Sequence, residues 1–233
     1  MKIFKPKFWQ SRGNLFCFLL LPFSLAYQLL LFIKDRISLT KKFNLQVLCI
    51  GNIYIGGTGK TPLSILINNE LKKNKKKVVI IKKHYKSHKD EHNLILKETG
   101  SLILEKTRSQ ALSRAEEKGY DIAILDDGFQ DPTIYKNLNI LCFNSRQLIG
   151  NGLTLPSGPL REKFNSIKKA EIIIINGKKN KIFERKIFDI SKNIKIYYSK
   201  YVPYELVKIK NRKILAFAGI GNPSNFFELL TQD

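Results

Sequence analysis

Between residues 47 and 62 the chain reads Val47-Leu-Cys-Ile-Gly-Asn-Ile-Tyr-Ile-Gly-Gly-Thr-Gly-Lys-Thr-Pro62. An apolar strand, a glycine-rich loop and a helix with proline in its first turn follow one another, which is the order of a phosphate-binding loop. The glycines let backbone N–H groups turn toward a polyphosphate, and the N-terminal end of the next helix adds positive charge. We therefore expect a nucleotide-binding α/β fold, similar to the P-loop NTPases, around this loop.

The residues of the loop divide between nucleotide and metal binding. Lys60 can reach the terminal phosphates, and the hydroxyl group of Thr61 can hold Mg²⁺. The strict pattern has glycine five residues before Gly59, where this chain has Tyr54, so the loop matches in its second half. A tight turn without a ligand is the structural alternative. The predicted nucleotide-binding residues of the loop are Tyr54, Ile55, Gly56, Gly57, Thr58, Gly59, Lys60 and Thr61.

Composition limits the classes of partner. The chain has 233 residues, is 43% hydrophobic and carries a formal net charge of +22. It is long enough for one large or two small domains, and its apolar fraction excludes wholesale disorder. The charge suits an anionic membrane surface or a phosphorylated substrate. Because no module that reads nucleic acid is recognisable, we expect no nucleic acid partner. The cysteines lack metal or redox spacing, as expected of reduced thiols in the cytosol: Cys17, Cys49 and Cys142.

An apolar segment, Leu15 to Ile33, precedes the loop. It is compatible with a membrane-spanning helix, an anchor in the membrane interface or a buried core helix, whereas a cleaved signal peptide is disfavoured because the apolar run has no clean end. Pro22 predicts a break, with a second helix from about Pro22 to Arg36. We call the polar residues that share one narrow helical face the polar seam: Gln10, Asn14, Ser24, Gln28 and Asp35. We expect this seam to lie on the protein while the apolar face enters lipid.

The rest of the chain alternates between apolar runs and helical patterns. Helices are predicted at 62–73 and 109–118, a polar loop at 82–93, and strands at 78–81, 102–104, 122–126, 138–143, 171–176 and 213–218. This order predicts a mostly parallel sheet flanked by helices, with ligands at the carboxyl ends of the strands. We expect an N-terminal helical segment at 1–42, a nucleotide-binding domain at 43–176 and the start of a smaller C-terminal α/β domain at 177–233.

Three further segments carry groups suited to phosphate chemistry. Asp126-Asp127 closes a strand and can hold magnesium opposite Thr61, although a capping pair is the alternative. Asp90-Glu91 can take a proton from an attacking hydroxyl group, although a solvated turn has the same composition. Arg161, in the proline- and glycine-rich loop 150–162, offers a planar fork to phosphate. Histidines at 84, 88 and 92 have the spacing of a zinc site only if this segment is helical.

Together these motifs resemble those of the tetraacyldisaccharide 4′-kinase family of lipid A biosynthesis. In chain order they are Gly51-Asn52 with Gly56-Gly-Thr-Gly-Lys-Thr-Pro62, Asp90-Glu91, Asp126-Asp-Gly-Phe-Gln130, Gly150-Asn-Gly-Leu-Thr-Leu-Pro-Ser-Gly-Pro-Leu-Arg-Glu162, and Gly219-Ile-Gly-Asn-Pro223 with Phe226-Phe227. The resemblance covers nearly the whole chain, and Tyr54 is also usual for the family. The sequence departs from the family at Lys82-Lys83-His84-Tyr85, where Ser-Arg-Gly-Tyr is usual. We also expect the chain to lack the family's C-terminal Phe-Pro-Asp-His segment.

The resemblance implies transfer of the γ-phosphate of ATP to the 4′-hydroxyl group of a tetraacylated glucosamine disaccharide 1-phosphate, which forms lipid IVA. It implies that Asp90 and Lys60 are catalytic, that Arg161 lies near the phosphates, and that Thr61, Glu91 and Asp127 serve Mg²⁺. The expected setting is the cytoplasmic face of the inner membrane, with a peripheral or monotopic attachment and no obligate protein partner. A membrane-associated P-loop protein that binds nucleotide without transferring phosphate is the alternative.

Overall fold

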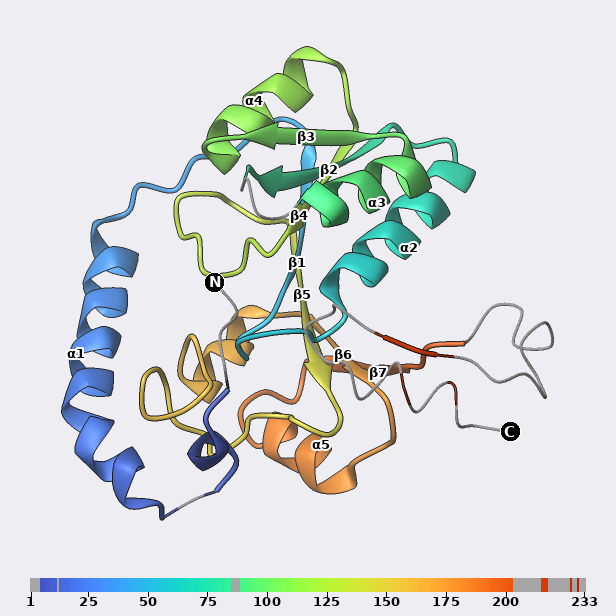
Figure 1. Cartoon of the computed structure of the whole chain (residues 1–233). Helices are drawn as coiled ribbons and strands as arrows, with labels where there is room; N and C mark the ends of the chain where they lie inside the picture. Colours follow the sequence, from blue (N-terminus) through green and yellow to red (C-terminus); the bar gives the residue numbers. More distant parts are fainter. Residues whose placement is uncertain are drawn as a thin grey trace.

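A computed structural model describes residues 5–11, 13–84, 89–202 and 215–217, together with Phe227 and Leu230. Within these residues, seven strands form one sheet in the order β3-β2-β4-β1-β5-β6-β7, and every pairing is parallel (Figure 1). The predicted parallel sheet is therefore confirmed. The strands are β1 (Gln46–Gly51), β2 (Val78–Lys83), β3 (Leu102–Glu105), β4 (Ile122–Asp126), β5 (Leu138–Asn144), β6 (Ile172–Asn176) and β7 (Lys195–Ser199).

Helices cover both faces of the sheet. One face packs against α2 (Lys60–Lys73) and α3 (Lys89–Thr99), and the other against α4 (Arg108–Glu117), α5 (Lys181–Phe188) and the 3₁₀ helix η3 (Phe164–Lys169). The residues of β2 alternate between the two cores and are buried on both sides, which explains why the strands read as continuous apolar runs.

Two segments differ from the predicted elements. The prediction of a polar loop at 82–93 is wrong, because β2 continues to Lys83 and α3 begins at Lys89. Burial of Ile95 against the sheet gives α3 the apolar contact that its polar first turn does not suggest. The strand expected at 213–218 falls largely outside the described residues, and residues 215–217 are not in a strand.

The sheet continues past residue 176. Strand β7 pairs with β6 over five residues, and Phe183 of α5 is buried against Phe143 with ring centroids 5.2 Å apart. Both elements therefore share the sheet and core of the nucleotide-binding region. The proposed division after residue 176 stays a prediction.

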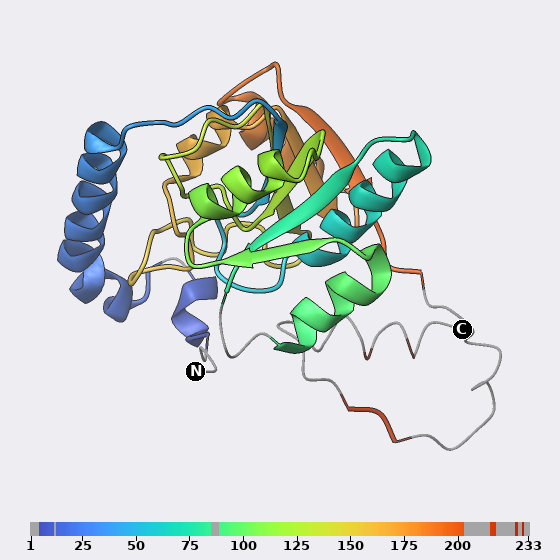
Figure 2. The ribbon, with the colours of Figure 1, turned by 90° about the horizontal axis from the view of Figure 1, so that it is seen from above.

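The apolar segment forms one helix, α1 (Leu15–Ile37), which follows the short 3₁₀ helix η1 (Lys7–Gln10). The predicted break at Pro22 is wrong, because the helix runs through the proline. A proline in a helix interior removes one hydrogen bond, and contacts of α1 with the body on both sides of Pro22, at Cys17 and Ser24, hold the helix together. Figure 2 and Figure 1 both place α1 along one flank of the molecule.

Most of α1 faces outward. Only 11% of its most apolar 18-residue stretch is buried, so the alternative prediction of a buried core helix is wrong. By length and composition, the helix could cross a membrane. The polar seam lies on the protein as predicted, since Ser24 donates to the carbonyl oxygen of Thr154 at 3.0 Å and Asp35 pairs with Lys169 at 2.8 Å. The outward side carries large exposed side chains: Leu15, Phe16, Phe18, Leu19, Phe23, Leu25, Leu29, Leu30, Phe32 and Ile33.

Candidate active site

The glycine-rich loop is held in shape by Asn52, directly after β1. Its side-chain amide donates to the carbonyl oxygens of Tyr54 and Gly56, at 2.6 and 3.2 Å, and to the hydroxyl group of Thr58 at 3.0 Å. Gly59 then takes the left-handed conformation, with φ of 90°, and caps the start of α2. This backbone turn brings Lys60 into the first turn of the helix, as the sequence predicts.

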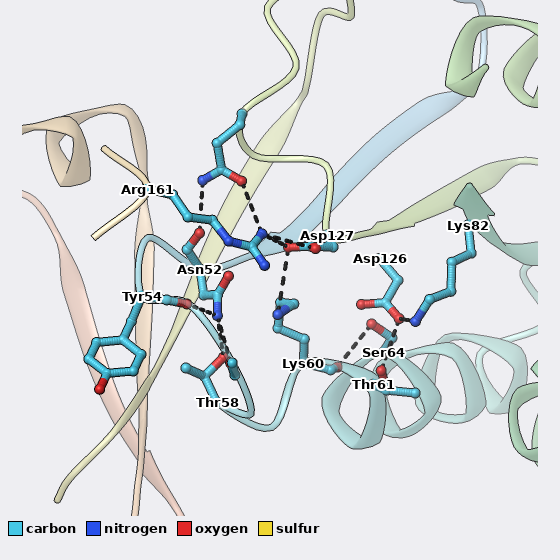
Figure 3. A network of polar contacts seen from close by, with 12 residues as sticks. Asn52, Tyr54, Thr58, Lys60, Thr61, Ser64, Lys82, Asp126, Asp127 and Arg161 are labelled. Carbon is cyan, nitrogen blue, oxygen red and sulfur yellow. Dashed lines mark hydrogen bonds and ion pairs between the residues drawn. The ribbon is translucent and has the colours of Figure 1, made fainter. Parts of the chain in front are cut away.

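The first half of the loop is bound to the proline- and glycine-rich loop 150–162. The backbone N–H of Ile55 donates to the carbonyl oxygen of Pro159 at 2.9 Å, and that of Arg161 donates to Ile53 at 2.7 Å. Tyr54 is fully buried, and Figure 3 shows its ring pointing away from the polar network. A large side chain is therefore accommodated where the strict motif has glycine, because the ring packs outside the phosphate side of the loop.

Asp126 and Asp127 serve two different groups of residues. Asp126 ends β4, and Asp127 has the left-handed backbone conformation, with φ of 65°. An aspartate tolerates this conformation better than most residues do. The resulting turn sends the two carboxylates in different directions, so that Thr61 lies beside Asp126 and Lys60 points to Asp127 (Figure 3).

The first group surrounds the hydroxyl group of Thr61. This hydroxyl lies within hydrogen-bond distance of Glu91 and, at 3.0 Å, of Asp126, and it donates its single proton to one of them at a time. The ammonium group of Lys82 lies 2.7 Å from Glu91 and 2.8 Å from Asp126. Burial alone would lower the pKa of Lys82, but the two carboxylates outweigh burial and raise the pKa above its ordinary value. Lys82 is therefore a protonated cation at this position.

The second group surrounds Asp127. One terminal nitrogen of Arg161 lies 2.8 and 3.0 Å from its carboxylate oxygens, the ammonium group of Lys60 lies 3.6 Å away, and Arg108 donates to its carbonyl oxygen. Burial would raise the pKa of Asp127, but the positive charges of Lys60 and Arg161 outweigh burial and hold the pKa below its ordinary value. Asp127 is therefore an ionised bridge between the two basic side chains that the sequence predicts at the phosphates.

A cavity of about 430 Å³ opens beside the second group. Four basic side chains line it, from α1, β2, α4 and the loop 150–162. The lining residues are Lys34, Lys83, Thr107, Arg108, Ser109, Asp127, Gln130, Asp131, Thr133 and Arg161. The excess of positive over negative groups suits an anionic polar ligand.

The structure separates Asp90 from Glu91. Both lie in the first turn of α3, where Glu91 reaches Lys82 and Thr61, while Asp90 is exposed to solvent. The rings of His84 and His92 lie with centroids 6.1 Å apart, and His88 is outside the described residues. Among the described residues, no three His, Cys, Asp or Glu side chains form a metal-binding group.

Two basic members of these groups are not predicted from the sequence. Lys82 joins the Thr61 group because β2 lies next to β4, and Arg108 joins the Asp127 group from the first turn of α4. The sequence holds a signal for Lys82, since it directly continues the buried run Val78–Ile81. Charged side chains are almost never fully buried unless they are paired.

The residues around Thr61 fit a magnesium ion. They offer the hydroxyl oxygen of Thr61 and the carboxylates of Glu91 and Asp126, which are the hard oxygen donors that Mg²⁺ prefers. The Oδ1 atom of Asp126 is buried and has no hydrogen-bond partner among the described residues. Since a buried carboxylate oxygen needs a partner, this atom suits a hydrated divalent cation. Asp127, which the sequence assigns to the metal, lies instead against Lys60 and Arg161.

Comparison with known proteins gives the family. The sequence model of the LpxK family, tetraacyldisaccharide-1-P 4'-kinase, matches residues 16–233. The chain belongs to this family. The tetraacyldisaccharide 4'-kinase of Pelagibacter ubique is 43% identical over 234 residues, which cover 99% of this chain and 74% of that protein. The kinase of Rickettsia akari is 32% identical, with the same two coverages of 99% and 74%.

Solved structures agree with the kinase family fold. The structure of LpxK from Aquifex aeolicus in complex with ATP has a TM-score of 0.70 and 24% sequence identity, and the match covers 93% of this chain and 78% of that chain. The signal recognition particle 54 kDa protein of Aeropyrum pernix in complex with GDP has a TM-score of 0.50 and 12% identity, over 86% of this chain and 51% of that one. The described fold is thus that of the tetraacyldisaccharide 4'-kinases and, more distantly, of other P-loop proteins.

Proposed function

We propose that the chain transfers the γ-phosphate of ATP to the 4′-hydroxyl group of a tetraacylated glucosamine disaccharide 1-phosphate. The names of its relatives and the ATP complex of the Aquifex kinase support the reaction and the phosphate donor. One structural observation carries the proposal: Lys60 and Thr61 converge with the carboxylates of Glu91, Asp126 and Asp127 at the carboxyl end of the sheet. Phosphate-binding and acidic groups thus meet where α/β proteins bind their ligands.

The reacting groups follow from the chemistry of phosphoryl transfer. The 4′-oxygen forms a bond to the γ-phosphorus, the bond from that phosphorus to the β–γ bridging oxygen breaks, and ADP leaves with the electron pair. Asp90, which is exposed and directly precedes Glu91 in the first turn of α3, takes the proton of the hydroxyl group as the general base. Lys60 and Arg161 stabilise the negative charge that develops on the phosphate oxygens.

Magnesium is part of the proposal. Thr61, Glu91 and Asp126 would hold the ion, and Asp127 stays a predicted ligand. When bound, Mg²⁺ would neutralise charge on the phosphates and fix their orientation. The residues themselves keep both carboxylates within hydrogen-bond distance of the hydroxyl group of Thr61.

Helix α1 and the basic cavity support a lipid substrate at a membrane surface. We infer that the apolar side of α1 lies in the membrane interface, because its large side chains face away from the body. The four basic residues that line the cavity suit the anionic headgroup of such a substrate. Since ATP is the donor, the cavity faces the cytoplasm. We propose no obligate protein partner.

Transfer of labelled phosphate from ATP to a tetraacyl disaccharide 1-phosphate in detergent micelles tests the proposal. The wild-type protein should form the bisphosphorylated lipid, and Asp90→Asn should lose this product while it still binds ATP. Glu98→Gln, near the other end of α3, is the matched control and should keep activity. ATP binding by the wild type without lipid phosphorylation would overturn the proposal and favour a nucleotide-dependent regulatory protein.

A further inference from the structure

The two oxygen atoms that gather at Thr61 also hold a buried ammonium group. Lys82 and Thr61 both contact Oε1 of Glu91 and Oδ2 of Asp126, so two donors share the same two acceptors. The side chain of Lys82 is 8% exposed and that of Asp126 is fully buried. Lys82 therefore occupies the inner side of the oxygen cluster rather than its solvent side.

The backbone fixes Lys82 at this position. Strand β2 pairs with β4 so that Ile81 lies opposite Leu125, which brings the next residues of the two strands, Lys82 and Asp126, to the same sheet edge. The preceding residues of β2 are buried on both faces of the sheet, and Lys82 is itself buried. Its ammonium group neutralises one of the two carboxylate charges, which would otherwise repel each other in a poorly solvated place.

We propose that Lys82 is a resident cation of the metal site and competes with the divalent cation for the shared oxygens of Glu91 and Asp126. A magnesium ion and an ammonium group on the same two oxygens repel each other, so the ion binds only when Lys82 withdraws. The protein without nucleotide therefore binds a divalent cation weakly, and the phosphates of the nucleotide supply the additional ligands that displace Lys82. The inference deepens the proposed function and rests on its magnesium site.

Binding of Mn²⁺ to the nucleotide-free protein tests this inference. Mn²⁺ takes the same oxygen ligands as Mg²⁺, and its free concentration is measured by electron paramagnetic resonance. Lys82→Gln keeps an uncharged amide donor for the carboxylates, and Lys82→Met keeps an unbranched side chain without a donor. We expect both variants to bind Mn²⁺ at least tenfold more tightly than the wild type does. Lys72→Met is the matched control, because Lys72 is a half-buried lysine bonded to Thr99 and Ser101 instead.

Equal or weaker Mn²⁺ binding by the two Lys82 variants would overturn the inference. The wild type gives an independent test that needs no variant to fold, since micromolar binding of Mn²⁺ without nucleotide would also overturn it. Neither measurement uses ATP or lipid. A protein that gives the expected Mn²⁺ result but no lipid phosphorylation would overturn the proposed function alone, and the reverse pair of results would overturn this inference alone.

Discussion

The hydroxyl group of Tyr27, on α1, donates a hydrogen bond of 2.9 Å to the carbonyl oxygen of Arg161. The side chain of the same arginine contacts the carboxylate of Asp127, which in turn lies 3.6 Å from Lys60. A continuous series of polar contacts therefore runs from the apolar flank helix to the lysine of the phosphate-binding loop. The position of Arg161 depends on both ends of this series.

Tyr27→Phe removes the hydrogen bond to Arg161 and keeps the ring. A neutral hydrogen bond contributes about 1 kcal/mol, which corresponds to about fivefold in rate. We expect kcat to fall by about this factor, with little change in the KM for ATP, because the arginine is displaced rather than removed. Tyr197→Phe, at an exposed tyrosine of β7, is the control, and an unchanged kcat in Tyr27→Phe would contradict the prediction.

Arg161→Lys should be far more harmful than its conserved charge suggests. Lysine lacks the planar guanidinium group, which in this structure contacts both carboxylate oxygens of Asp127. We expect kcat/KM for lipid phosphorylation to fall by about 10²-fold, as for the loss of one preorganised donor. Initial rates measure this effect, and Arg185→Lys on the exposed side of α5 should not reproduce it. Near wild-type rates in Arg161→Lys would contradict a role of Arg161 at the phosphates.

The carboxylate of Asp127 should stabilise the fold in a pH-dependent way. Its pKa lies below the ordinary value of 3.8, so its contribution is fully present above that pH and is lost as the pH falls through the lower, folded-state pKa. We expect the difference in free energy of unfolding between wild type and Asp127→Asn to shrink as the pH falls from neutral to about 3. Urea unfolding measures it, and a difference that stays constant over this range would contradict the lowered pKa.

The outward side of α1 should carry binding to anionic vesicles. Burial of one leucine side chain contributes about 1.5–3 kcal/mol, so Leu19→Gln combined with Leu30→Gln should weaken binding by more than about 10²-fold. Sedimentation with vesicles measures the bound fraction. Leu66→Gln changes a similarly exposed leucine on α2 and should leave binding intact. Equal loss in both proteins would show that α1 has no special role.

Phe183→Ala tests whether α5 belongs to the core of the nucleotide-binding region. Its ring is buried against Phe143 and Phe164, and loss of such a ring costs about 3–5 kcal/mol of the free energy of unfolding. Phe188→Ala, on the same helix but partly exposed, should cost much less. Thermal or urea unfolding measures both. Equal free energies of unfolding for the Phe183→Ala and Phe188→Ala variants would contradict this prediction and favour a separate domain after residue 176.

The fold was predictable wherever a strand is buried on both faces. Strand β4 matches its predicted bounds because a short apolar run ends in acidic residues. The apolar runs of β1, β2 and β5 also predict strands, and β2 and β5 extend past their predicted ends, to Lys83 and Asn144. Strand β7 was not predicted, because it lies at the edge of the sheet and none of its residues is fully buried. Helix α3 was missed for a similar reason, since its first turn is polar.

From the sequence, only those residues of the candidate site that lie in a local motif could be predicted, and not the contacts between distant segments. The sequence predicts Lys60, Thr61 and the acidic pairs because each lies in a local motif. It does not predict that Asp126, rather than Asp127, contacts Thr61, because this depends on the left-handed turn at Asp127. The position of Lys82 after an apolar run indicates that it is paired, but the sequence does not identify its partners, because those contacts come from the order of strands in the sheet.

Helix α1 exposes apolar side chains along its whole side rather than at one end. A helix of 23 residues is about 35 Å long, and large apolar side chains cover its outer side over this length. In the proposed membrane attachment, a molecule held along such a line can neither tumble nor roll freely, so the mouth of its cavity keeps one height above the acyl chains. The encounter with a lipid headgroup then becomes a search in two dimensions, and its rate follows the surface density of the lipid instead of its bulk concentration.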